Sequence, residues 1–300
     1  MKKQKWFMVR FLAPAVLVFL AIFLYPCIRT LMMSVHKVEF VTDSMSEWTF
    51  TGLENFKTLF ASPVFIRSLI NVLKIWIGAG AAILGLAMLF SVMLTSNIKG
   101  KQFWKAVLYL PSVISAVALV TMWLQYVFNN QYGLFKTLFE TLHWDKMAQF
   151  QWTSPDHLFL SMMIAFTFGS VGFYVLIFVA GIDGISKDYY EAATIDGAGA
   201  ITKFLKITVP LLKDTIKRSI VLYTAGALGF FVYSSLFSLR MELSTVTPIV
   251  YMYENVFGSS LSASSTELNV GMGAAVGVIV TLVVLIVNLV LDKLIKSEKN

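Results

Sequence analysis

One long polar stretch, residues 186–210, lies between apolar runs and carries side chains suited to docking rather than to breaking bonds. Ser186 can cap a short helix at its start. An exposed carboxylate on that helix, Glu191, can accept charge-assisted hydrogen bonds from a partner. The small side chains of Ala192 and Ala193 let a partner surface come close. The chemistry expected here is therefore the binding of another protein.

The second half of this stretch predicts a reversal of the chain. Gly197 and Gly199 interrupt the first helix, since glycine adopts the backbone angles of a sharp turn at little cost. A second short helical run, residues 201–208, leads to Pro210, which suits the first turn of a following helix. The sequence thus predicts a helix–turn–helix elbow over residues 184–214.

Patterns that would support catalysis are weak elsewhere in the chain. No GxxxxGK[ST] motif is present to cradle ATP phosphates. Residues 169–172 read G-S-x-G rather than the G-x-S-G of an intramembrane serine nucleophile, and the three histidines fall in expected external loops or at a span edge. Cys27, the one cysteine, excludes a disulfide framework. We expect no catalytic residue, no metal site and no cofactor in this chain.

The composition is that of an all-α integral membrane protein. Of 300 residues, 57% are hydrophobic and only 14% are charged, against about 25% charged in soluble domains. About twenty apolar residues cross a bilayer core as a helix. Six segments meet this requirement, at about 11–33, 72–95, 106–128, 158–182, 216–239 and 269–291.

Charge distribution predicts how these spans are oriented. The basic N-terminus and the apolar run after it resemble a signal peptide, but no small-residue cleavage site follows, so we expect a retained first span. Of the 24 Lys and Arg residues, 16 fall on one set of loops and six on the other. The richer side faces the cytoplasm. Both termini and the elbow are therefore expected on the cytoplasmic side of the cell membrane.

The elbow resembles a known signature. Its pattern is Glu191-Ala192-Ala193, three residues, Gly197, nine residues, Ile207, one residue and Val209-Pro210. It is similar to the loop of permease subunits of ABC importers, in which Leu stands where this chain has Val209. In that family the loop docks into a cleft of the ATP-hydrolysing subunit. The resemblance assigns this coupling role to Glu191, Ala192, Ala193, Asp196, Gly197, Ile207 and Pro210.

The likeness extends over most of the chain. Four segments look like the carbohydrate-uptake branch of these permeases, the maltose, glycerol-phosphate and multiple-sugar type. They read GLENFKTLF from residue 52, FWKAVLYLPSVISAVALVTMW from 103, NNQYGLF from 129 and VGFYVLIFVAGIDGISKDYYEAATIDGAG from 171. One departure follows the expected fifth span. That branch has Gly-Gly-Pro and then Thr, whereas this chain has Thr247-Pro248 without the glycine pair.

The resemblance implies a set of partners and a domain layout. It implies a place in a bacterial cell membrane, a second permease subunit, two ATP-binding subunits that carry the ATP, and an extracellular solute-binding protein. One chain holds one elbow and the two-ATPase engine needs two, hence the second permease. The layout expected is an N-terminal tail, first span and external segment over 1–66, a permease core over 67–291, and a cytoplasmic tail over 292–300.

The spans themselves point to a neutral substrate. Charged residues are almost absent from the second to sixth spans, whereas an ion-coupled transporter usually needs them. Aromatic rings stack on sugar C–H surfaces, and the best candidates for the substrate pathway are Trp123, Tyr126, Tyr174 and Tyr233. The same rings also suit a lipid-facing belt. The main interpretation is a sugar importer permease; the alternative is a six-span ion-coupled secondary transporter.

Overall fold

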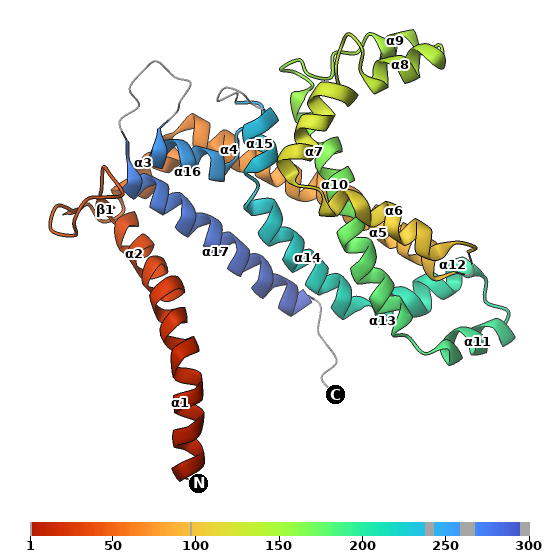
Figure 1. Cartoon of the computed structure of the whole chain (residues 1–300), viewed down its shortest axis with the longest axis horizontal. Helices are drawn as coiled ribbons and strands as arrows, with labels where there is room; N and C mark the ends of the chain where they lie inside the picture. Colours follow the sequence, from red (N-terminus) through yellow and green to blue (C-terminus); the bar gives the residue numbers. More distant parts are fainter. Residues whose placement is uncertain (1, 97, 238–242, 259–267, 295–300) are drawn as a thin grey trace. The chain divides into compact units, whose positions relative to one another are not determined.

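The computed structural model describes residues 2–96, 98–237, 243–258 and 268–294, and it is mostly helical (Figure 1). Within these ranges, four helices are long and apolar enough to cross a membrane. They cover the first, second, fourth and sixth expected spans. Their bounds are Arg10–Ser34, Pro63–Thr95, Leu158–Asp183 and Val270–Lys293.

The expected third span is bent. Helix α6 (Lys101–Val113) is followed by α7 (Ala116–Met122) and the π-helical turn η3 (Trp123–Val127), and the two halves meet at 97°. Ile114 and Ser115 between them have extended backbone angles. Pro111 lies just before this break and lacks the N–H that a helix uses. The pair counts as a fifth span if both halves lie in the membrane.

The expected fifth span, residues 216–239, is also divided. Helix α14 (Lys213–Leu228) ends at Gly229, and a short helix α15 (Val232–Phe237) follows. Residues 238 and 239 lie outside the described residues. With 16 residues, α14 is shorter than the length that about 30 Å of hydrocarbon requires.

The chain forms two compact units, and we describe each by itself. The first holds residues 1–66 and 251–282. Here Asn55 donates hydrogen bonds to the carbonyls of Ser34 and His36, both at 2.9 Å. A Cβ on Gly271 would lie 2.3 Å from the His36 carbonyl oxygen, so only glycine fits there. Its elements are α1 (Lys2–Phe19), η1 (Leu20–Leu24), α2 (Tyr25–Ser34), β1 (His36–Lys37), β2 (Thr49–Phe50), α3 (Glu54–Ala61), most of α16 (Pro248–Phe257) and the first half of α17 (Val270–Leu294).

The second unit, residues 67–250 and 283–300, is organised around α10 (Leu158–Asp183). This helix packs along α5 (Gly80–Thr95) and α6 (Figure 1). A Cβ on Gly172 would lie 2.0 Å from the Leu108 carbonyl oxygen, so α6 and α10 touch backbone to backbone there. Ser91 also donates a hydrogen bond to the Val175 carbonyl across α5 and α10, at 3.0 Å. Other helices of this unit are most of α4 (Pro63–Lys74), α8 (Leu134–Thr141) and α9 (Asp145–Ala148).

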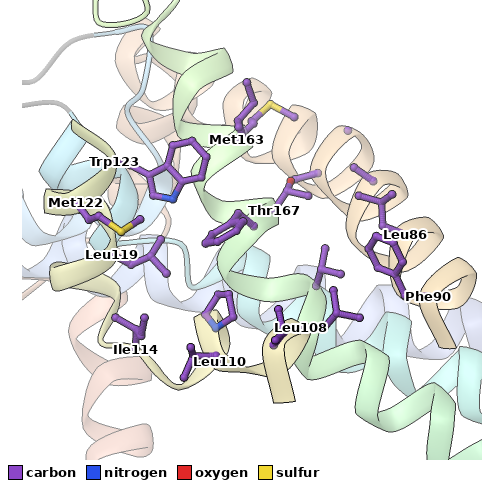
Figure 2. Close-up of a pocket in the computed structure, with 18 of the residues that line it drawn as sticks. Leu86, Phe90, Leu108, Leu110, Ile114, Leu119, Met122, Trp123, Met163 and Thr167 are labelled. Atoms are coloured by element: carbon purple, nitrogen blue, oxygen red, sulfur yellow. The ribbon is translucent and has the colours of Figure 1, made fainter. Parts of the chain in front are cut away.

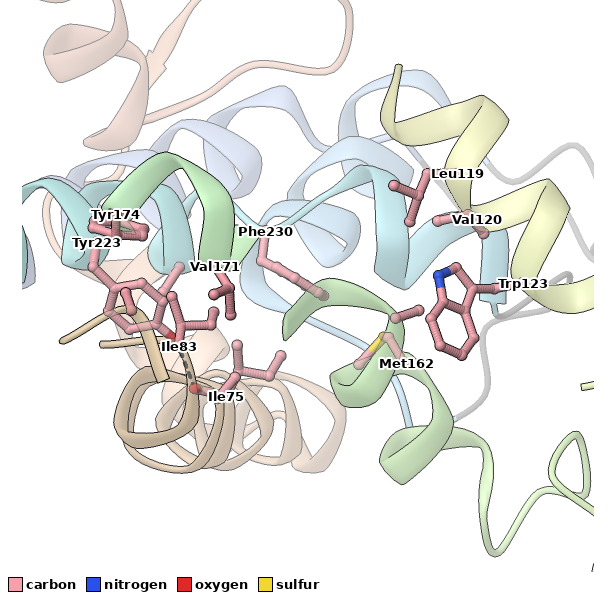
Figure 3. Close-up of a cluster of buried hydrophobic side chains, with 14 of the residues drawn as sticks. Ile75, Ile83, Leu119, Val120, Trp123, Met162, Val171, Tyr174, Tyr223 and Phe230 are labelled. Carbon is pink, nitrogen blue, oxygen red and sulfur yellow. Dashed lines mark hydrogen bonds between the residues drawn. The ribbon is translucent and has the colours of Figure 1, made fainter. Parts of the chain in front are cut away.

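A widened turn joins α4 to α5. The π-helical segment η2 (Ile75–Ala79) continues the helix without a break. Tyr223 of α14 donates its hydroxyl to the Ile75 carbonyl at 2.8 Å, the dashed bond of Figure 3. Beside it, Trp76 donates its indole N–H to Thr224 at 2.8 Å. These two bonds tie α14 to the second span inside an otherwise apolar cluster.

Candidate functional site

The elbow forms as a helix–turn–helix. Its first helix, α11 (Lys187–Ile195), is capped by the Ser186 hydroxyl, which accepts a hydrogen bond from the Asp188 N–H at 3.3 Å. Gly197 has φ of +75°, a left-handed conformation that side-chain-bearing residues rarely adopt. The second arm is α12 (Ala200–Lys203), η4 (Phe204–Thr208) and α13 (Val209–Leu211), with Pro210 in the first turn of α13.

Two side-chain hydrogen bonds hold the arms together. The hydroxyl groups of Tyr190 and Thr208 lie 2.9 Å apart, and Thr208 is 5% exposed. Lys203 donates its ammonium group to the Thr194 hydroxyl at 2.7 Å. Sequence reasoning missed both bonds, because each joins residues nine or more positions apart whose pairing depends on the turn angle. These contacts fix the direction in which α11 projects.

The elbow presents a mixed apolar and acidic surface. Ile195 is 87% exposed and Ile201 is 76% exposed. Glu191 and Asp196 are exposed on the same stretch of chain. Of the other residues given a coupling role, Ala192 and Pro210 are exposed, whereas Ala193 and Ile207 are half-buried. An elbow that only linked two spans would not need large exposed apolar side chains.

A notch of mixed apolar and polar lining lies where the elbow meets the ends of the spans. It encloses about 330 Å³ between the C-terminal ends of α5 and α10 and the two arms of the elbow. Its lining combines apolar side chains with polar ones: Val92, Ile182, Ile185 and Phe204 on the one hand, and Thr95, Asp183, Lys187 and Lys203 on the other. Asp183 also pairs with Lys105 at 3.8 Å. The elbow therefore meets the span ends around a notch of mixed apolar and polar side chains rather than through a close-packed core.

The four residues expected along a substrate pathway fall in different places. Tyr174, 7% exposed, and the half-buried Tyr233 belong to one chain of rings. Tyr174 and Tyr223 lie 6.2 Å apart, centroid to centroid, and Phe166 links Tyr223 to Tyr233 at 6.5 and 5.3 Å. The Tyr233 hydroxyl lies against Gly169, where a Cβ would approach it to 2.6 Å.

Trp123 and Tyr126 lie apart from that chain of rings. Trp123 is 7% exposed and packs against Phe128 and Phe168 at 4.9 and 5.4 Å. Its indole N–H has no acceptor among the described residues. Tyr126 is 64% exposed. Two residues three positions apart on one turn thus face opposite environments.

Beneath the bend between α6 and α7 lies a cavity of about 800 Å³ (Figure 2). Leu86 and Phe90 of α5, Met163 and Thr167 of α10, and Leu108, Leu110, Ile114, Leu119, Met122 and Trp123 of the bent pair line it (Figure 2). Its wall is almost wholly apolar. No sequence signal pointed to this cavity, because it depends on the 97° angle between two short helices.

Comparison with known proteins shows the family to which the chain belongs. Residues 83–298 match the family described as binding-protein-dependent transport system inner membrane component. The chain belongs to this family. The permease is 28% identical to the arabinooligosaccharides transport system permease AraP of Bacillus subtilis, over 96% of this chain and 88% of AraP. It is 30% identical to the probable ABC transporter permease YurN of the same organism, over 96% of each chain.

Further relatives bear on the branch and the fold. The trehalose/maltose transport system permease MalF of Thermococcus litoralis is 29% identical over 73% of this chain and 72% of its own. A bacterial ABC transporter involved in the import of the acidic polysaccharide alginate has a similar fold, with a TM-score of 0.77, 22% identity and 99% and 98% of the two chains covered.

These matches decide between the two interpretations drawn from the sequence. The resemblance to the carbohydrate-uptake branch is confirmed, because several relatives are named as permeases for sugars. The permease is a multi-pass membrane protein and a subunit of a binding-protein-dependent ABC importer. The ion-coupled secondary transporter finds no support among the relatives.

Proposed function

We propose that this permease forms half of the translocation pathway of an importer for a neutral oligosaccharide, and that its elbow couples the pathway to an ATPase. The observation that carries the coupling proposal is the exposed elbow in a chain of this family. An exposed apolar pair beside two carboxylates is typical of a surface that a partner covers. Closure of the ATPase subunits then moves the elbow. The elbow residues that line the notch pass that motion to the ends of α5 and α10.

The proposed assembly contains this permease, a second permease, two ATP-binding subunits and an extracellular solute-binding protein. ATP binds to the ATPase subunits and not to this chain, which has no phosphate loop in its sequence. Because each permease offers one elbow, two permeases engage two ATPases. The purified permease alone is expected to hydrolyse no ATP, and measurable turnover by it would contradict this division of labour.

The topology proposed has six spans with both termini and the elbow inside. The third span is the bent pair and the fifth is α14 with α15. Reporter fusions at Trp48, Asp145 and Glu254 should report outside, and fusions at Gly100 and Lys203 inside. An inverted pattern at any of these positions would contradict the topology.

The proposed substrate site is the chain of rings that contains Tyr174 and Tyr233. Hydroxyl-bearing rings stack on sugar faces and hydrogen-bond sugar hydroxyls, and no charged side chain belongs to this group of rings. The relatives named for arabinooligosaccharides and for trehalose/maltose support an oligosaccharide as the substrate. Trp123 and Tyr126 remain candidates from the sequence.

Coupling and substrate contact are tested separately in the reconstituted importer. Glu191→Lys should reduce co-purification of the ATPase while the permease reaches the membrane in normal amounts. Glu140→Lys, a charge reversal at another exposed residue, on α8 and paired with Lys136 at the surface, is the control. Full ATPase binding by Glu191→Lys would overturn the coupling role of the carboxylate.

For the substrate, alanine is placed at Trp123, Tyr126, Tyr174 and Tyr233 in turn. Replacement of Tyr174 or Tyr233 should raise the sugar concentration needed for half-maximal uptake, with the complex still assembled. Tyr132→Ala, a 65% exposed ring in the loop before α8, serves as the control. If all four replacements leave uptake unchanged, the second permease supplies the substrate contacts.

A further inference from the structure

The cavity under the bend continues as a groove toward the loop between α5 and α6. A second cavity of about 370 Å³ shares Phe90 and Leu108 with the first. Its remaining lining is Met93, Leu94, Ile98 and Trp104. Together the two cavities make an apolar groove between α5 and α6, here called the α5–α6 groove. It runs from the bend to the loop that joins these two helices.

The walls of the groove are unsuited to a sugar. Among its described lining residues, Thr167 contributes the one hydroxyl group and Trp123 and Trp104 the two indole N–H groups. No charged side chain lines it. A sugar in this space would lose hydrogen bonds to water without replacing them, which costs free energy for every hydroxyl buried. A hydrocarbon chain would lose no hydrogen bonds on entering this space, because it makes none with water.

The loop end of the groove is basic. Lys99 and Lys101 flank it, next to Ile98 and Trp104 of its lining, and both are exposed. Within the described part of the chain, neither makes an ion pair, whereas Lys105 is paired with Asp183. The segment from Ile98 to Lys105 contains no acidic residue. Positive charge beside an apolar channel fits a molecule with an anionic head and a hydrocarbon tail.

We propose that the α5–α6 groove binds an anionic phospholipid of the membrane, with an acyl chain in the groove and the phosphate beside Lys99 and Lys101. Anionic lipids are attracted by basic clusters at the membrane surface. Trp104 at the mouth has the amphipathic character of tryptophans found at headgroup depth. A neighbouring protein helix in the same groove would instead need an acidic residue opposite the two lysines. The site is separate from the chain of rings that contains Tyr174 and Tyr233, and it shares only Trp123 with the four candidates for the substrate pathway.

The test uses the full chain in nanodiscs of phosphatidylcholine that contain a small share of a photoactivatable lipid. The lipid is phosphatidylglycerol or phosphatidylcholine with the same diazirine-bearing acyl chain. We expect labelling to map to residues 86–90 and 108–114, several-fold stronger for phosphatidylglycerol. Lys99→Gln with Lys101→Gln should remove that preference. Lys206→Gln with Lys293→Gln, two exposed lysines outside the groove, should not.

A filling variant tests the acyl-chain part independently. Ala82 lines the cavity, so Ala82→Trp should lower labelling in the groove while labelling of α1 stays unchanged. Equal labelling by both lipids, or labelling indifferent to the lysine pair, would overturn the proposal. So would loss of groove labelling in the assembled importer together with new cross-links to another subunit, since a protein helix would then be the occupant.

Discussion

The elbow and the helices packed around α10 differ in what holds them in place. The elbow is mostly exposed and is held by two side-chain hydrogen bonds, Tyr190 to Thr208 and Lys203 to Thr194. Around α10, helices touch backbone to backbone and bury large side chains. An exposed hydrogen-bonded element can reorient at a small cost, whereas a close-packed one cannot. The contrast teaches that substitutions in the two regions should affect different measurements.

A glycine substitution in the packed region around α10 should have the largest effect. Gly172→Ala places a Cβ 2.0 Å from the Leu108 carbonyl oxygen and must push α6 away from α10. Overpacking of this kind costs about 3 kcal/mol. Membrane abundance and thermal stability should fall sharply. Gly226→Ala in α14, where a Cβ meets no atom within 4 Å, is the matched control, and equal behaviour of the two variants would contradict the close approach.

In the elbow, a glycine substitution should spare folding and abolish coupling. Gly197→Val meets no atom within 4 Å, so its strain comes only from φ of +75°. That strain costs roughly 1–3 kcal/mol and is relieved by reorienting α11. We expect normal membrane abundance, lost uptake and lost co-purification of the ATPase.

Gly199→Val provides the control for that variant. Gly199 also has open space around it, but its backbone is extended, with φ of −71° and ψ of 171°. Valine adopts such angles readily. Uptake should therefore persist in Gly199→Val. Loss of uptake in both variants would mean that bulk at the turn, rather than its backbone angle, interferes with coupling.

A smaller effect is expected from the hydrogen bond that closes the elbow. Tyr190→Phe removes one hydroxyl that is bonded to the buried Thr208, a loss of about 1 kcal/mol. Hydrogen exchange over residues 204–208 should become faster and uptake should decline partially. Tyr189→Phe, whose ring is 57% exposed, should change neither quantity. Unchanged exchange in Tyr190→Phe would show that the elbow is held elsewhere.

The smallest expected effect is a change in Tm when the half-buried carboxylate of Glu254, rather than the exposed one of Glu191, is neutralised. Burial raises the pKa of Glu254 above its ordinary 4.5, and one of its oxygens has no hydrogen-bond partner among the described residues. The folded state therefore binds the proton of the Glu254 carboxyl more tightly than the unfolded chain does. The stability that this bound proton contributes is lost as the pH rises through the raised pKa. Glu254→Gln should raise Tm modestly at pH 7 and not below pH 4.5. Glu191→Gln on the exposed elbow should leave Tm unchanged at both.

Local features of the elbow could be predicted from the sequence, because they depend on neighbouring residues. The Ser186 cap and the turn at Gly197 form as expected. The bend in the third span could not be predicted, although Pro111 is visible in the sequence. Its angle depends on tertiary packing, because α6 packs on α10 whereas α7 packs mainly on α15. The sequence also could not predict that Trp123 is buried while Tyr126 is exposed. Both residues are aromatic, and a spacing of three places them near the same face of a helix.

The π-helical turn between α4 and α5 fixes a phase relation along the second span. A π-turn holds one residue more than the α-helix needs, so the side chains before and after it follow two different angular series. Removing one residue between Ile75 and Ala79 would turn the π-turn into an ordinary α-turn, and α5 would keep its facing relative to α4. Ser91 would still face the Val175 carbonyl, whereas one residue inserted or removed elsewhere in α5 would rotate Ser91 by about 100° away from it.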